Sequence, residues 1–185
     1  MKPLAEQLRP HTLDQYLGQE HLIGQNGALR KSLDIGRLPS IVLWGPPGVG
    51  KTTLALLLAK DLEAPLYQLS AVSAGVKDVR EVLAAAEKKS LFDNKRPILF
   101  IDEIHRFNKG QQDSLLHAVE RGWITLIGAT TENPSFEMNA ALLSRMQVYV
   151  LNSHSKEDLT KMIELANKTE YATQKDLKIT AHDFL

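Results

Sequence analysis

Short runs of apolar residues alternate with segments of helical periodicity through the middle of the chain. The runs predict strands at 41–44, 66–69, 98–101, 123–127 and 148–150. The runs at 41–44 and 98–101 have the continuous apolar character of strands that are buried on both faces. Between the strands, the spacing of apolar residues predicts helices over 51–62, 76–89 and 110–121. Such alternation is typical of a parallel sheet covered by helices, so the sequence predicts an α/β fold.

The beginning of the chain has no such strand pattern. Thr12 and Gln15 have the spacing of a capping box, in which two side chains bond free amides at the start of a helix. We therefore expect residues 1–24 to form an arm with one short helix, and residues 25–151 to form the main domain.

Another helical pattern follows the last predicted strand. Ser155 and Asp158 have capping-box spacing, and apolar residues with helical periodicity come after them. Thr180 and Asp183 repeat this spacing close to the end of the sequence. Because a single helical turn is unstable in water, we expect residues 152–185 to be the truncated beginning of a larger helical unit.

Composition narrows the class of protein. With 185 residues, the chain has room for one ordinary domain and a smaller unit. Hydrophobic residues make up 43% and charged residues 24%, as in globular proteins, and no apolar run approaches the roughly 20 residues of a transmembrane helix. The sequence has no cysteine, which rules out disulfides and thiolate metal sites, and it has no N-terminal signal pattern. We therefore expect a cytoplasmic protein without a membrane partner.

One loop carries a specific chemical signal. It follows the strand at 41–44 and matches the pattern G-x-x-x-x-G-K-[ST] with Gly45, Pro46, Pro47, Gly48, Val49, Gly50, Lys51 and Thr52. Glycines let backbone amides turn inward toward phosphate oxygens, and the helix that follows adds its positive end. We expect Lys51 to reach the β- and γ-phosphates of ATP, Thr52 to hold Mg²⁺, and Thr53 to complete the nucleotide contacts. The alternative is a glycine-rich turn that binds nothing.

Two acidic residues end the predicted strand at 98–101. Asp102 and Glu103 follow four apolar residues, and ligands of open α/β sheets bind at this end of the strands. We expect Asp102 to orient Mg²⁺ and Glu103 to polarise the attacking water; the alternative is that both acids only cap the next helix. A GTPase is disfavoured because the sequence has no Asn-Lys-x-Asp motif to read the base.

A third polar segment, Gly-Ala-Thr-Thr-Glu-Asn at 128–133, follows the predicted strand at 123–127. A polar side chain there would lie between the phosphate loop and the acid pair, close to the γ-phosphate. Thr131 is the first candidate for this sensor and Asn133 the second, while Thr130 stays open. The alternative is a turn rich in Thr and Asn without such a role.

Together these motifs resemble the AAA+ ATPases, and within them the clamp-loader-like branch. The resemblance is most specific at 102–113, 127–136 and 141–145, which read DEIHRFNKGQQD, IGATTENPSF and ALLSR. These strings are similar to those of the RarA/MgsA family of replication-associated recombination proteins, also called Werner-helicase-interacting ATPases. The Holliday-junction motor RuvB is similar as well, but it lacks the His-Arg-Phe-Asn-Lys and Glu-Asn-Pro-Ser-Phe pieces.

The resemblance implies a three-layer P-loop domain with five parallel strands in the order 5-1-4-3-2, followed by the start of a helical lid. It places Arg9, Pro10 and Leu17 in the segment that cradles adenine. It also makes Arg145 an arginine finger, which enters the site of the neighbouring subunit in a homo-oligomer. The family's lid carries a further arginine, and this sequence has none after Arg145, so we expect nucleotide binding with weak hydrolysis.

DNA contact is expected from the helix after the acid pair, since this helix faces DNA in clamp loaders. Arg106, Lys109, Gln111 and Gln112 supply cations and amides of the kind that bind phosphates. The formal net charge is zero, with 22 basic and 22 acidic residues, so such a contact would be local; a solvated helix face is the alternative. The six histidines have no metal-ligand spacing and are interpreted as structural.

The sequence therefore predicts an ATP- and Mg²⁺-dependent ATPase that acts on DNA at stalled replication forks, in replication-coupled recombination and repair. Forked, gapped or single-stranded DNA ends are its expected substrates, and replication or single-strand-binding proteins its expected partners. Two alternatives are a nucleotide-gated scaffold that recruits such proteins and a branch-migration motor similar to RuvB.

Overall fold

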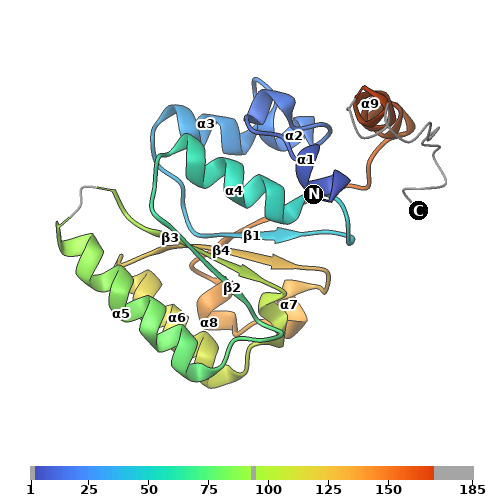
Figure 1. Ribbon diagram of the computed structural model, residues 1–185. Helices are drawn as coiled ribbons and strands as arrows, with labels where there is room; N and C mark the ends of the chain where they lie inside the picture. Colours follow the sequence, from blue (N-terminus) through green and yellow to red (C-terminus); the bar gives the residue numbers. More distant parts are fainter. Residues whose placement is uncertain (1–2, 93–94, 169–185) are drawn as a thin grey trace.

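The computed structural model describes residues 3–92 and 95–168, which form a central sheet with helices on both faces (Figure 1). The sheet consists of β1 (Ile41–Trp44), β2 (Leu66–Ser70), β3 (Ile98–Asp102), β4 (Thr125–Thr130) and β5 (Gln147–Val150). All neighbouring strands pair in parallel, in the order β2-β3-β4-β1-β5. The predicted α/β fold and strand order are therefore confirmed.

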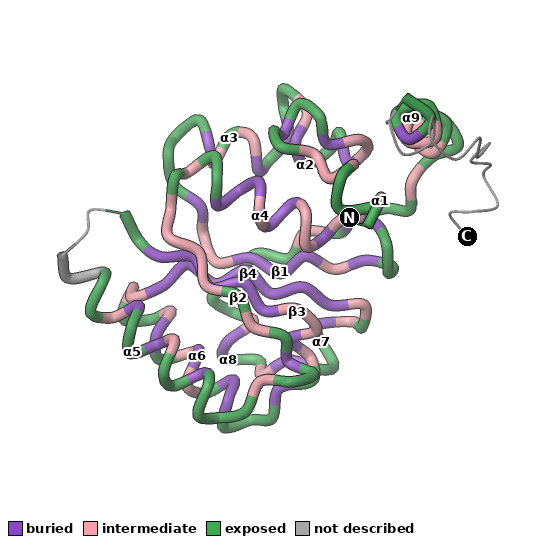
Figure 2. The backbone as a smooth tube through the Cα atoms, in the orientation of Figure 1, coloured by how far each residue is buried: buried purple, intermediate pink, exposed green. Residues whose placement is uncertain are grey.

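Side chains of the inner strands alternate between two hydrophobic cores, one on each face of the sheet. Figure 2 shows that these strands are buried along most of their length. In β1, Ile41 and Leu43 pack into one core, whereas Val42 between them packs into the other. The first core is covered by α3 (Ala28–Asp34) and α4 (Lys51–Asp61). The second is covered by α5 (Val76–Phe92), α6 (Lys109–Glu120), α7 (Pro134–Glu137) and α8 (Ala140–Leu143). This burial on both faces is the reason for the continuous apolar runs of the inner strands.

β4 begins at Thr125 rather than at the predicted residue 123. Gly122 ends α6 with a φ of 73°, and the Trp123 N–H donates to the carbonyl of Ala118 at 3.0 Å. This is the hydrogen bond of a helix C-cap, so Trp123 belongs to the end of the helix rather than to the strand.

The N-terminal arm contains three short helical segments where one was predicted: α1 (Leu4–Gln7), a 3-10 helix at Leu13–Gln15, and α2 (Glu20–Ile23). The predicted capping box is wrong, because the Thr12 side chain bonds no helix amide. The Gln15 side chain instead accepts a hydrogen bond from the His11 N–H at 2.9 Å. The segment ends after Gln15, where Tyr16 turns into the core, and is too short for a capping box.

Helix α9 (Lys156–Asn167) begins with the capping box that the sequence predicts. Ser155 Oγ accepts from the Asp158 N–H at 3.1 Å, and Asp158 Oδ2 accepts from the Ser155 N–H at 3.1 Å. The helix lies to one side of the sheet (Figure 1). The predicted helix start at Thr180 and Asp183 lies outside the described residues. In the described ranges, no helix has both the length and the apolar character needed to span a membrane.

Candidate nucleotide-binding site

The loop between β1 and α4 is shaped by its glycines. Gly48 and Gly50 have φ angles of 78° and 92°, in the left-handed region that side chains disfavour. A Cβ atom at Gly50 would lie 2.4 Å from the hydroxyl oxygen of Tyr16, so only glycine fits there. At Gly48, a Cβ atom would meet nothing within 4 Å, which leaves this part of the loop open.

Lys51, the first residue of α4, points back into this loop. Its Nζ donates to the carbonyl oxygens of Gly45 and Pro46, both at 2.7 Å, and the residue is buried. Burial lowers the pKa of the Lys51 ammonium, and the nearby carboxylates of Glu103 and Asp102 oppose that shift. A buried ammonium whose hydrogen-bond partners are neutral carbonyls is poorly compensated, and phosphate oxygens are partners that suit it better. The loop residues therefore fit a bound nucleotide phosphate.

The register of the sheet brings the three polar segments to one edge. Trp44 at the end of β1 pairs with Thr130 at the end of β4, and the Gly45 N–H donates to the Thr130 carbonyl at 3.2 Å. On the other side of β4, strand β3 ends at Asp102. The phosphate loop, the acid pair and the Thr-Thr segment thus leave the sheet from adjacent strands, where α/β proteins bind ligands.

Glu103 directs the chain out of the sheet in an unusual conformation. Its φ of 53° lies in the left-handed region, which is strained for a residue with a side chain and is frequent at functional sites. The residue precedes a 3-10 helix, η2 (Ile104–Arg106), but its side chain bonds none of the helix amides. The alternative that Glu103 only caps the next helix is therefore wrong. Instead, the Thr131 hydroxyl donates to Glu103 Oε2 at 3.5 Å.

The three sensor candidates differ in what their side chains contact. Thr130 is fully buried, and its hydroxyl is engaged with the His105 ring at 2.9 Å and with the backbone of Glu132. Asn133 Oδ1 accepts from the Ser135 N–H at 3.0 Å and caps α7. Thr131 is the candidate whose hydroxyl contacts the acid pair.

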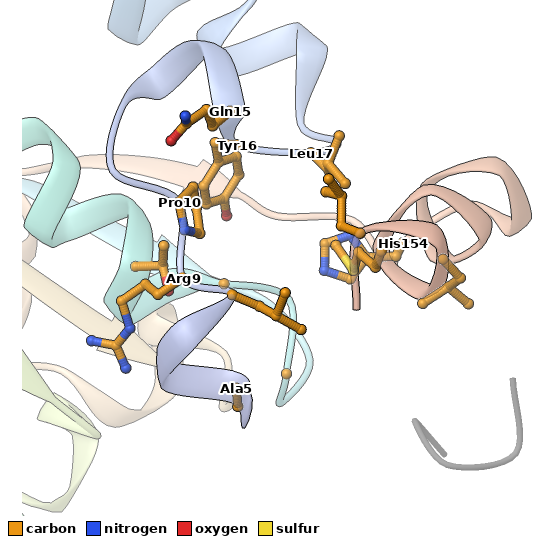
Figure 3. A pocket seen from close by; sticks show the side chains of 14 residues that line it. Ala5, Arg9, Pro10, Gln15, Tyr16, Leu17 and His154 are labelled. Carbon is orange, nitrogen blue, oxygen red and sulfur yellow. The ribbon is translucent and has the colours of Figure 1, made fainter. Parts of the chain in front are cut away.

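A pocket of about 380 Å³ lies between the N-terminal arm, the phosphate loop and α9 (Figure 3). It is lined by Arg9, Pro10 and Leu17, the residues that the resemblance assigns to adenine binding. The sequence did not predict its other walls, which comprise Ala5, Leu8, Gln15, Tyr16, Gly48, Gly50, Thr53, His154, Leu159, Met162 and Leu165. The apolar periodicity after Ser155 predicted a helix, but not the surface that this helix covers.

Tyr16 joins the arm to the phosphate loop. Its hydroxyl donates to the carbonyl of Val49 at 3.0 Å, and its ring lies beside Gly50. Burial raises the pKa of the Tyr16 hydroxyl well above its usual range, so the group stays protonated and remains a donor. Tyr16 is a site residue that sequence reasoning missed, because a buried tyrosine in an arm has no local signal of this role.

Arg145 lies outside this pocket, after the end of α8. Its Nη1 donates to the Ala141 carbonyl at 2.8 Å and to Ser144 Oγ at 3.0 Å. Its Nη2 forms an ion pair with Glu120 Oε1 at 2.5 Å, with 41% of the arginine side chain exposed. The guanidinium is therefore at the surface and oriented by α6 and α8.

The expected DNA contacts divide into two groups. Arg106 and Lys109 are exposed. Gln111 and Gln112 are buried, and their amides are used inside the protein. Gln111 completes the capping box with Asn108 and donates to the Ala74 carbonyl, and Gln112 donates to the Phe107 carbonyl at 2.9 Å. The expectation that these two glutamines contact DNA is corrected, because the start of α6 requires them.

These features define a P-loop ATPase of the AAA+ type, with a phosphate loop after β1, an acid pair after β3 and a polar segment after β4. A family model, ATPase family associated with various cellular activities (AAA), matches residues 41–154. The match spans more than half of the chain, and the chain belongs to this family.

Similar proteins confirm the narrower resemblance. The chain is 50% identical over 164 residues to Replication-associated recombination protein A of Haemophilus influenzae, and covers 36% of that protein. It is 50% identical over 179 residues to the protein of that name in Coxiella burnetii, with 40% covered. ATPase WRNIP1 of Dictyostelium discoideum is 51% identical over 162 residues, or 88% of this chain and 18% of WRNIP1.

Among solved structures, the RuvB Holliday junction branch migration motor of Thermotoga maritima matches with a TM-score of 0.73. It is 32% identical, and the match covers 94% of this chain and 57% of RuvB. The chain spans 36–40% of the length of the two bacterial recombination proteins named above.

Proposed function

We propose that this chain is the nucleotide-binding and hydrolysing part of a Mg²⁺-dependent ATPase that acts on DNA in replication-associated recombination and repair. The observation that carries the proposal is the contact between Thr131 and Glu103, beside the phosphate loop that holds Lys51. The relatives named replication-associated recombination protein support the process.

Each part of the nucleotide has a matching surface in this proposal. The pocket of Pro10, Tyr16 and Leu17 takes the adenine, with Arg9 at its margin. The amides at 45–52 take the phosphates, and Lys51 exchanges its two carbonyl partners for phosphate oxygens. The phosphate-binding loop consists of Gly45, Pro46, Pro47, Gly48, Val49 and Gly50. Thr53, on the helix that follows, faces the pocket.

Thr52 and Asp102 are the residues that would hold Mg²⁺. In the described part of the chain, no three His, Asp or Glu side chains form a metal cluster. One hydroxyl and one carboxylate suit Mg²⁺, which usually completes its shell with phosphate oxygens and water. The ion would neutralise phosphate charge during the reaction.

Glu103 is the proposed general base. Water attacks the γ-phosphorus, its proton passes to Glu103, and the bond to the β-γ bridging oxygen breaks to release ADP and phosphate. Thr131 lies against Glu103 and acts as the γ-phosphate sensor. Arg145 is exposed and acts in trans on the site of a neighbouring subunit, where an arginine finger is worth about 10³–10⁵ in rate. Hydrolysis therefore depends on a homo-oligomer.

DNA is the proposed partner of the exposed Arg106 and Lys109, which lie on η2 and at the start of α6. Cations at these positions bind backbone phosphates without reading the base sequence. Forked, gapped or single-stranded ends are the proposed substrates, with replication or single-strand-binding proteins as further partners.

The test is steady-state ATP hydrolysis by the full-length protein, with and without forked or gapped duplex DNA. We expect DNA to stimulate turnover, and Glu103→Gln to reduce it at least 100-fold while ATP still binds. Mixing Arg145→Ala with Glu103→Gln subunits should restore part of the activity, because each variant supplies what the other lacks. Full turnover by Glu103→Gln would contradict the proposal, and turnover indifferent to every DNA would favour a nucleotide-gated scaffold.

The likeness to RuvB favours one second candidate, a branch-migration motor. Such a motor moves a four-way junction in an ATP-dependent reaction. The test is whether the same protein preparations move a synthetic mobile four-way junction, with Lys51→Met as the control of weakened nucleotide binding. Strand exchange by the wild type alone would establish the motor.

A further inference from the structure

His105 lies against the proposed base. It belongs to η2, and only 12% of its side chain is exposed. Its Nδ1 lies 3.3 Å from Glu103 Oε2 and 2.9 Å from Thr130 Oγ1. The ring therefore bridges the acid after β3 and the buried hydroxyl at the end of β4.

The contacts of Thr130 Oγ1 favour a tautomer with the proton on Nδ1. Thr130 Oγ1 accepts from the Glu132 N–H at 3.0 Å, and its single proton can be donated to the Glu132 carbonyl at 3.2 Å. A carboxylate oxygen only accepts, so an unprotonated Nδ1 would place two lone pairs against each other. A proton on Nδ1 fits this arrangement, because Thr130 Oγ1 can accept it and the Glu103 carboxylate lies beside it. In this tautomer the imidazole has an N–H beside the carboxylate.

The backbone that carries His105 is anchored on both sides. The Arg106 N–H donates to the Glu103 carbonyl at 2.9 Å, which closes the turn after the strained Glu103. Ile104 is fully buried below β4, and a Cβ atom at Gly128 would come within 2.9 Å of its Cδ1. The imidazole consequently approaches Glu103 from a fixed direction, which is a requirement for holding a catalytic group in place.

We propose that His105 is a positioning residue for Glu103, an inference that rests on the proposed ATPase function. His105 Nδ1 and the Thr131 hydroxyl lie 3.3 and 3.5 Å from Oε2, so together they would fix the carboxylate and leave Oε1 to the attacking water. The buried Thr130 hydroxyl lies 2.9 Å from the same nitrogen and holds this edge of the imidazole beside the carboxylate.

Substitutions that keep or remove the donor test this role in the full-length protein. His105→Asn places an amide N–H near the position of Nδ1, whereas His105→Leu fills the space without a donor. We expect His105→Leu to lower kcat about 10- to 100-fold with the dissociation constant for ATP changed less than twofold. His105→Asn should recover most of the lost rate. His117→Leu, on α6 and packed edge-on against Trp123, is the control and should keep the wild-type rate.

A double variant separates positioning from a structural role. If His105 acts through Glu103, His105→Leu has no further effect on the residual rate of Glu103→Gln. An unchanged kcat in His105→Leu would overturn the inference. Equal losses of kcat in the Leu and Asn variants would overturn it as well. So would a double variant in which His105→Leu lowers the residual rate of Glu103→Gln by the same factor as it lowers the wild-type rate. The failure of the proposed function is distinct, because there Glu103→Gln itself would keep full turnover.

Discussion

Gln19 and Asn152 form a reciprocal pair of hydrogen bonds across 133 positions of the chain. Gln19 Nε2 donates to the Asn152 carbonyl at 2.7 Å, and the Asn152 N–H donates to Gln19 Oε1 at 2.9 Å. The Gln19 side chain is buried, with 6% of the residue exposed. This pair connects the N-terminal arm, which lines the pocket of Figure 3, to the segment between β5 and α9 that carries the pocket residue His154.

Removing this pair of hydrogen bonds should lower the stability of the protein and weaken ATP binding. Gln19→Ala leaves the backbone groups of Asn152 without their partner, which costs about 1–3 kcal/mol when such groups are buried. We expect a lower free energy of unfolding by urea denaturation and weaker ATP binding by calorimetry. Gln25→Ala, at an exposed position of the arm's border, is the matched control and should change neither. Wild-type ATP affinity in Gln19→Ala would show that the arm is held by other contacts.

Lys51→Met should abolish tight nucleotide binding without unfolding the protein. The ammonium bonds only the carbonyls of its own loop, so methionine removes no contact between elements. The lost charge-assisted hydrogen bonds to phosphate correspond to about 1.5–3 kcal/mol, which is roughly a 10- to 150-fold larger dissociation constant for ATP. Fluorescent ATP analogues measure this, with Lys88→Met on the exposed face of α5 as control. A wild-type dissociation constant in Lys51→Met would place the phosphates elsewhere.

Tyr16→Phe tests the link between the arm and the phosphate loop. The variant removes the donor to the Val49 carbonyl, and we expect it to lower the free energy of unfolding by about 1 kcal/mol. Tyr149→Phe removes a hydroxyl that bonds the exposed Gln147 side chain and should cost less than about 0.5 kcal/mol. Chemical denaturation of both variants gives the comparison, and equal losses would contradict the role of Tyr16.

The ion pair between Arg145 and Glu120 should matter for orientation rather than for stability. Both side chains are over 40% exposed, and such pairs contribute about 0–1 kcal/mol. We therefore expect Glu120→Gln to leave the thermal midpoint nearly unchanged but to lower the oligomer-dependent ATPase rate several-fold. The measurement is turnover against protein concentration. A large fall in the midpoint would instead make the pair a structural contact.

The capping box of α9 makes this helix sensitive to acid. The hydrogen bond from Ser155 lowers the pKa of the Asp158 carboxyl, so the folded state binds its proton less readily than the unfolded state does. Its stabilising contribution is complete above the ordinary aspartate pKa of about 3.9 and is lost as the pH falls through the lower folded value. NMR titration of the Asp158 carboxyl measures the shift. Ser155→Ala should reduce this shift and destabilise α9 by about 1 kcal/mol; an unshifted wild-type carboxyl would contradict the cap.

Much of the fold could be predicted because its signals are local. The apolar run at 41–44 and the loop that follows have fixed spacings along the chain, and the five strands were located from such runs. The strand order followed from the family resemblance, not from the pattern. The error at 123–127 arose because the helix cap of Trp123 resembles the start of a strand in sequence. The Thr12 capping box failed because the spacing alone does not report how soon a helix ends.

In the candidate site, too, the features carried by neighbouring residues could be predicted, whereas the contacts between distant segments could not. The sequence by itself determined the phosphate loop and the acid pair, because neighbouring residues in one loop or at one strand end carry that chemistry. Only the tertiary structure decided that Thr131 rather than Asn133 meets Glu103, that Gln111 is buried, and that α9 forms a wall of the pocket beside the phosphate loop. These outcomes depend on contacts between strands and helices far apart in the chain, whose register and packing no local pattern records.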